Sequence, residues 1–123
     1  MSQTDRIDYL ELAAPDLPAS KAFYSAVFGW KFEDFGPEYA SFREARLEGG
    51  LTSTRLPAPL GSGALVVFRA DDIRVAEKRI VAAGGKITTE LFDFPGGHRF
   101  HFTDPGGNEL AAWAPHEHSL GHE

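Results

Sequence analysis

The chain of 123 residues contains no cysteine. Disulfides, thiolate metal sites and thiol catalysis are therefore excluded. Long apolar runs are also missing, since stretches such as 64–68 are far too short to span a membrane. The first ten residues lack the cationic and apolar segments of a secretory signal. We therefore expect a cytoplasmic protein with no membrane partner.

The chain also lacks a basic cluster. Its net charge is −6, and pairs such as Lys78-Arg79, or Arg43 with Arg46, are interspersed with glutamates. Nucleic-acid binding depends on a concentration of cationic side chains against phosphates, so we expect no nucleic-acid partner. An anionic ligand would need a local exception to this overall charge.

What the chain does contain is an internal repeat with an offset of 56 residues. Seven residues of the first copy align without a gap with seven of the second. They are Leu10, Leu12, Ala14, Asp16, Leu17, Ala26 and Gly29, aligned with Val66, Phe68, Ala70, Asp72, Ile73, Ala82 and Gly85. Each copy is typical of a buried strand, an aspartate that caps a helix, and a glycine that ends the helix.

The alternation of apolar and polar residues, together with residues typical of turns, predicts the other elements. In the first copy we expect strands at 7–13, 30–32, 39–45 and 50–54 around a helix that ends at Gly29. A connector rich in proline and glycine follows at 55–63. In the second copy we expect strands at 64–70, 86–94, 99–103 and 109–113, the last two joined by the turn Asp104-Pro-Gly-Gly-Asn108.

These elements predict an α+β fold made of two βαβββ modules, at about residues 5–56 and 62–114. We expect residues 1–123 to form a single domain with a polar tail at 115–123. The economical packing places the helices outside two curled mixed β-sheets, related by a pseudo-twofold axis. Their concave faces would enclose a central groove suited to a small-molecule ligand.

Four segments carry a family likeness: IDYLELAAPD, KAFYSAVFGW, VVFRADDI and FHFTDPGGNELAAW. Over residues 7–114 the chain resembles the vicinal oxygen chelate superfamily, which includes glyoxalase I, bleomycin-resistance proteins, fosfomycin-resistance enzymes and extradiol dioxygenases. The resemblance implies the fold of those proteins and a homodimer. It leaves open whether two chains exchange modules.

The resemblance also implies where a divalent metal would bind. The positions that carry ligands in the metalloenzymes are Tyr9, its repeat partner Leu65, Ala111, and a position near Leu51 to Ser53. Leucine and alanine cannot coordinate an ion. We therefore expect no cofactor and no metal at the usual site.

Strand alternation predicts which side chains face the groove. Glu109 shares the face of Ala111, and His101 shares a face with Arg99. By resemblance, His101 stands where fosfomycin-resistance members have a substrate-contacting tyrosine. The predicted ligand-binding residues are Tyr9, Glu11, Trp30, Phe68, Arg99, His101, Glu109 and Trp113, of which His101 and Glu109 are the candidate catalytic pair.

Several roles stay open at this point. His101 is either a general base or a hydrogen-bonded histidine in a polar core. Arg99 either receives an anionic group or pairs with Glu109, and we favour the pair. His98 and His101 lie three residues apart on one strand, so they should point to opposite faces and not share an ion. We expect no functional site in the polar tail, which carries His116, His118 and His122.

The function that we favour is binding, without the usual metal, of an apolar-aromatic compound with one polar group. One alternative is a glyoxalase-like lyase, isomerase or hydrolase that uses His101 with a groove carboxylate, or a metal in an atypical geometry. Another is a regulatory or interaction module with a vestigial pocket.

Overall fold

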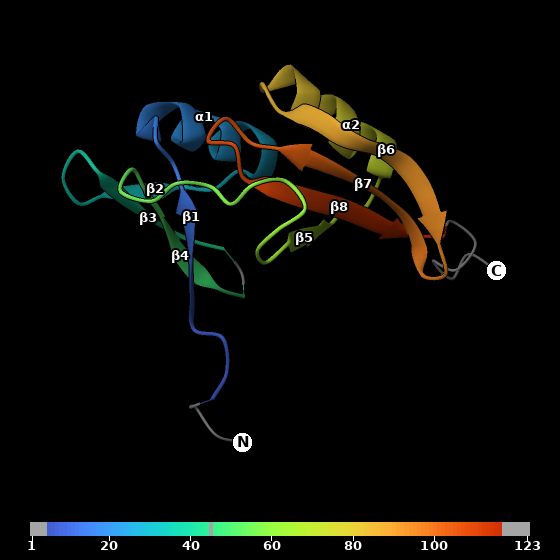
Figure 1. The fold of residues 1–123 in the computed structure, drawn as a ribbon, viewed down its shortest axis with the longest axis horizontal. Helices are drawn as coiled ribbons and strands as arrows, with labels where there is room; N and C mark the ends of the chain where they lie inside the picture. Colours follow the sequence, from blue (N-terminus) through green and yellow to red (C-terminus); the bar gives the residue numbers. More distant parts are fainter. Residues whose placement is uncertain (1–4, 45, 117–123) are drawn as a thin grey trace.

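A computed structural model describes residues 5–44 and 46–116. In it the chain forms two successive βαβββ modules (Figure 1). The first consists of β1 (Tyr9–Ala13), α1 (Leu17–Phe28), β2 (Phe32–Asp34), β3 (Tyr39–Arg43) and β4 (Glu48–Thr52). The second consists of β5 (Val66–Arg69), α2 (Ile73–Ala82), β6 (Lys86–Phe94), β7 (Gly97–Thr103) and β8 (Glu109–Pro115).

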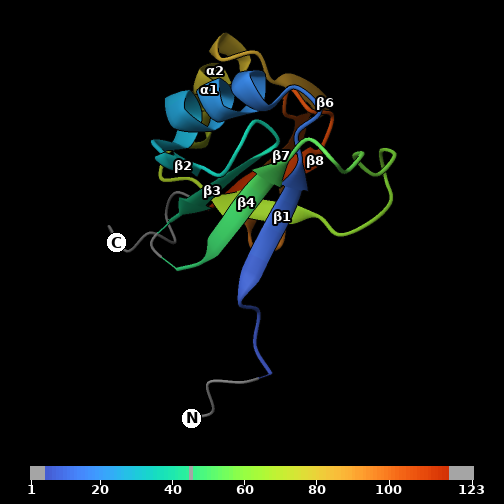
Figure 2. The ribbon, with the colours of Figure 1, turned by 90° about the vertical axis from the view of Figure 1, so that its left-hand side faces the viewer.

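Each module contributes one four-stranded mixed sheet. The strand orders are β1-β4-β3-β2 and β5-β8-β7-β6, with β1 parallel to β4 and β5 parallel to β8. Both helices lie on the same side of the two sheets, as Figures 1 and 2 show from perpendicular directions. The predicted α+β fold is confirmed. Within the described ranges, no helix is long and apolar enough to cross a membrane.

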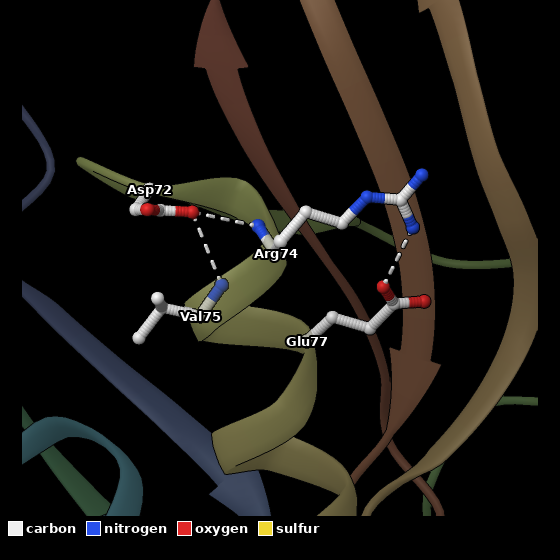
Figure 3. A network of polar contacts seen from close by, with 4 residues as sticks. All are labelled: Asp72, Arg74, Val75 and Glu77. Atoms are coloured by element: carbon white, nitrogen blue, oxygen red, sulfur yellow. Dashed lines mark hydrogen bonds and ion pairs between the residues drawn. The ribbon is translucent and has the colours of Figure 1, made fainter.

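Aspartates cap both helices, as the repeat predicts. The side chain of Asp16 accepts a hydrogen bond from the backbone N–H of Ala19 at 3.2 Å. Asp72 accepts from the backbone N–H groups of Arg74 and Val75 at 3.1 and 3.2 Å (Figure 3). These donors have no partner inside a helix, so a cap satisfies them. The predicted caps are confirmed in both modules.

The strand boundaries in the first module differ from the prediction, and two of the differences follow from packing. The strand expected at 30–32 begins only at Phe32, because Trp30 completes the end of α1 with a backbone bond to Tyr24 and is buried. Gly49 and Gly50, expected as a turn and a strand start, both lie inside β4. There the ring of Phe42 covers Gly49 on one face, and the ring of Tyr39 covers Gly50 on the other. A tertiary contact thus converts turn residues into strand residues.

The hydrophobic core draws on both modules. Phe23 and Tyr24 of α1, Ile80 of α2, and Phe100 and Phe102 of β7 are each at most 1% exposed and belong to one buried cluster. The rings of Phe23 and Phe102 lie 6.4 Å apart between centroids. This packing holds the second sheet in place beneath the first helix.

A buried polar junction also links the modules, at the turn between β7 and β8. The Asp104 carboxylate accepts a 2.5 Å hydrogen bond from the hydroxyl of Tyr24, which lies on α1. The same carboxylate accepts from the backbone N–H of Gly106 and from both nitrogens of Asn108. The amide of Asn108 also donates to the carbonyl of Ala13 at 2.7 Å. The predicted turn therefore also anchors the first module to the second.

Candidate functional site

The second sheet presents a polar face away from its helix. On β7 and β8 the core residues Phe100, Phe102, Leu110 and Ala112 are at most 2% exposed. By alternation the opposite face carries the intervening side chains. The predicted site residues Arg99, His101, Glu109 and Trp113 all lie on this face.

His101 and Glu109 are in direct contact there. The Nδ1 atom of His101 lies 2.9 Å from Oε2 of Glu109, and the two side chains are only 15% and 17% exposed. On the other side of the ring, Nε2 accepts a hydrogen bond from Nε of Arg99 at 3.2 Å. A guanidinium can only donate, so this network assigns the proton to Nδ1, which donates to Glu109.

Glu109 is also held by the connector between the modules. The backbone N–H of Gly61 donates to its Oε1 at 2.8 Å. This hydrogen bond and, after it, the one from His101 lower the pKa of Glu109. Glu109 is therefore a carboxylate with both oxygens engaged, and it orients the His101 ring.

The favoured pairing of Arg99 with Glu109 is wrong. Within the described residues, the side-chain partners of Glu109 are Gly61 and His101, while Arg99 donates to His101. The sheet register explains the difference. Arg99 lies opposite Trp113, whereas Glu109 lies opposite Thr103 at the far end of the hairpin.

The first sheet presents a separate polar group. The hydroxyl of Tyr39 donates to Oε2 of Glu11 at 2.9 Å and lies 2.7 Å from the hydroxyl of Tyr9. Burial, followed by these two hydrogen bonds, raises the pKa of Tyr39. The missing side chain of Gly50 leaves room for the Tyr39 ring to cross β4 and reach Glu11 on β1.

Sequence reasoning placed Tyr9 and Glu11 on one face but missed Tyr39. The alternation of the strand could have shown that Tyr39 shares this kind of face. Tyr39 alternates with Ala40 and Phe42 at the start of a predicted strand, so it had to lie on the face opposite the core. That signal does not identify its partners, which depend on how three strands align.

Trp30 and Phe68 lie mainly in the core, apart from the polar groups. Trp30 is 8% exposed and stacks between Tyr24 and Phe42, with centroid distances of 4.8 and 4.0 Å. Phe68 stacks on Phe28 at 4.1 Å. Both side chains nevertheless line a cavity of about 890 Å³, together with Trp113.

The cavity lies at the junction of the modules. From the first module it is lined by the end of α1 and the turn between β3 and β4, and from the second by β5 and β8. The eight predicted residues thus form three groups: His101, Arg99 and Glu109; Tyr9 and Glu11; and Trp30, Phe68 and Trp113. Trp113 connects the first group to the cavity, because it lies opposite Arg99 on the same sheet face.

The other described histidines, His98 and His116, lie away from His101. The Nδ1 atom of His98 lies 2.6 Å from Asp93, while His101 contacts Glu109, so the two do not share partners, as predicted. His116, in the predicted polar tail, contacts the second sheet. Its ring lies 4.9 Å from that of His98, because β8 extends to Pro115 and brings it alongside β7. His118 and His122 lie outside the described residues.

The strand register relates the metal-ligand positions that the family resemblance implies in the two modules. In the first module Gly50 lies opposite Glu11. In the second module Ala111 lies opposite Val67, the residue that aligns with Glu11 in the repeat, so Gly50 is the counterpart of Ala111. By this register the equivalent position, Gly50, lies next to the region Leu51 to Ser53 that the resemblance indicates. Over residues 5–44 and 46–116, no group of three or more His, Asp or Glu side chains could hold an ion.

Comparison with known proteins bears on this site. The chain is 28% identical over 123 residues to "Putative glyoxylase CFP32" of Mycobacterium bovis, covering 90% of this chain and 46% of that protein. It is 29% identical over 124 residues to the anthracycline biosynthesis protein DnrV of Streptomyces peucetius, covering 85% of this chain and 45% of that protein. The chain thus spans about half the length of these curated relatives.

The fold also resembles that of TnmS3, an antibiotic-binding protein from Streptomyces sp. CB03234. The TM-score is 0.70 at 17% identity, and the match covers 94% of this chain and 99% of that one. Residues 6–112 match the family model described as Glyoxalase/Bleomycin resistance protein/Dioxygenase superfamily. The chain therefore belongs to this superfamily, in keeping with its duplicated βαβββ module.

Proposed function

We propose that this chain binds an apolar-aromatic small molecule at the module junction, with the hydrogen-bonded pair of Arg99 and His101 as polar groups beside the ligand. The observation that carries this proposal is the continuity of one surface. Trp113 lines the cavity and lies opposite Arg99, whose guanidinium reaches His101. An aromatic pocket with a few ordered polar groups at its side is typical of small-molecule sites.

The names of two similar proteins support the same class of ligand. DnrV is described as an anthracycline biosynthesis protein and TnmS3 as an antibiotic-binding protein. Both names point to small organic molecules, and the match to each extends through both modules of this chain. The likeness to TnmS3 is one of fold alone, so the ligand of this chain is argued from its own residues.

We also propose that binding does not need the usual divalent metal of the superfamily. The residues at the ligand positions are Tyr9, Gly50, Leu65 and Ala111. Three of them have no donor atom in the side chain, and the phenol of Tyr9 contacts Tyr39. Zinc and iron sites in proteins use imidazole, thiolate or carboxylate ligands, so these residues do not fit such an ion.

This absence of donors predicts the metal content of the purified protein. We expect far less than one zinc, nickel, manganese or iron ion per chain by elemental analysis, and an unchanged melting temperature after treatment with a chelator. About one ion per chain that survives the chelator would refute the proposal.

A catalytic role for His101 has one favourable observation, the contact with Glu109, which could stabilise a protonated imidazole. The other ring nitrogen argues against general-base catalysis. Nε2 accepts from Arg99, so the lone pair that a general base needs is engaged. Proton transfer would require Arg99 to leave the ring first.

A matched pair of histidine variants tests the proposed function. A thermal-shift screen of aromatic compounds identifies a ligand, and calorimetry then compares His101→Ala with His98→Ala. Each histidine contacts one carboxylate, but they lie on opposite faces of β7. We expect His101→Ala to weaken binding by about 1–3 kcal/mol, the cost of a lost buried hydrogen bond. His98→Ala should bind like the wild type.

Two results would contradict the proposed function, and each contradicts a different part of it. Equal losses in both variants would place the ligand away from the His101 face. A screen in which no aromatic compound raises the melting temperature would reject small-molecule binding of this class.

A further inference from the structure

We propose that the cavity at the module junction selects planar aromatic compounds that carry a negative charge, such as aryl carboxylates. This inference rests on the proposed function and specifies its ligand class. The cavity has an excess of positive charge, whereas the chain as a whole is negatively charged. The lining contains Lys31, Arg43, Arg46 and Arg69 but a single acidic residue, Glu44.

The gathering of cationic side chains around the cavity contrasts with the acidic composition of the whole chain. The chain has 18 acidic and 12 basic residues, and its net charge is −6. Four of those 12 cationic side chains line this one cavity. Charges of one sign gathered in a recess with apolar walls attract the opposite charge more strongly than the same charges on an open surface. The cavity is therefore the local exception that an anionic ligand requires.

Three of these four cations, Lys31, Arg46 and Arg69, form no ion pair with a carboxylate of the described residues. Arg43, by contrast, is paired with Glu48 at 2.6 Å. The carboxylate of a ligand would supply the missing partner and could accept two parallel hydrogen bonds from a guanidinium.

Arg69 is positioned by an aromatic ring. Its guanidinium carbon lies 5.4 Å from the centroid of the Trp113 ring, in a cation–π contact. Phe68 and Trp30 also line the cavity, and its volume of about 890 Å³ can take a fused ring system. An aromatic ligand would pack against these rings while its anionic group meets Arg69 and Lys31 at the rim.

The experiment compares two ligands with the same naphthalene ring system, the anionic 2-naphthoate and the neutral 2-naphthalenemethanol, by titration calorimetry. The wild type is expected to bind naphthoate at least about tenfold more tightly, with an advantage that shrinks at high salt. The two tryptophans of the chain both line the cavity, so their emission should change on binding.

Two variants test the assignment to residues. In Arg69→Met the affinity for naphthoate should fall to that for the alcohol, and Lys31→Met should reduce the advantage in the same direction. The control is Arg74→Met, which changes the net charge equally but removes an exposed α2 side chain paired with Glu77 (Figure 3). It should retain the full preference.

The possible failures are distinguishable. If the wild type binds both naphthalenes equally, or Arg69→Met keeps the preference, the charge selection is refuted while small-molecule binding stands. If neither compound gives heat or a change in emission, the cavity is not an aromatic anion site. The proposed function is rejected only by the separate screen described above.

Discussion

Replacing Asp104 with alanine is expected to lower the free energy of unfolding by about 3–5 kcal/mol, because the substitution leaves several buried donors without an acceptor. Asp104 is 4% exposed and Tyr24 is fully buried. The carboxylate accepts from the Tyr24 hydroxyl, from the backbone N–H of Gly106 and from both nitrogens of Asn108. Alanine can accept none of these hydrogen bonds with its side chain, and the Tyr24 hydroxyl, which is buried, loses its partner.

The measurement is urea unfolding followed by circular dichroism. A matched control is Asp93→Ala, which removes a carboxylate whose side chain is 76% exposed and which contacts His98. Exposed pairs of this kind contribute about 0–1 kcal/mol. If Asp104→Ala costs no more than Asp93→Ala, the junction between the modules does not stabilise the fold.

Trp30→Ala is expected to cost about 3–5 kcal/mol, the range for truncating a large aromatic side chain in a core. Trp30 is stacked between Tyr24 and Phe42 and is also close to Phe68, at 6.1 Å between centroids. Alanine would leave a cavity between the first sheet and the aromatic face of the second module. The loss should appear as a lower urea midpoint.

Trp113→Ala is the comparison variant. Trp113 is only partly buried and its face is open to the cavity, so its truncation should cost far less stability and should instead weaken binding of the aromatic ligand. Together the two variants separate a core tryptophan from a ligand-facing one. An unchanged midpoint for Trp30→Ala would show that the Trp30 ring does not stabilise the core.

The caps and the turn between β7 and β8 show what short-range patterns can predict. Asp16 and Asp72 bond to amides two or three residues away, and Asp104 bonds to Gly106 and Asn108 within its own turn. Interactions over such distances depend on residue type and local backbone geometry. Strand alternation has the same property, which is why Arg99, His101 and Glu109 were correctly assigned to one face.

The sequence by itself determined the duplicated module, the helix caps, the order of the elements and the shared face of Arg99, His101 and Glu109. Only the tertiary structure decided which faces meet. It joined Tyr24 to Asp104, turned Arg99 to His101 and not Glu109, placed Gly61 on Glu109, and gathered cations from both modules around one cavity. The physical reason is that alternation and capping act within a few residues, whereas register and the packing of two modules depend on contacts between segments far apart in the chain.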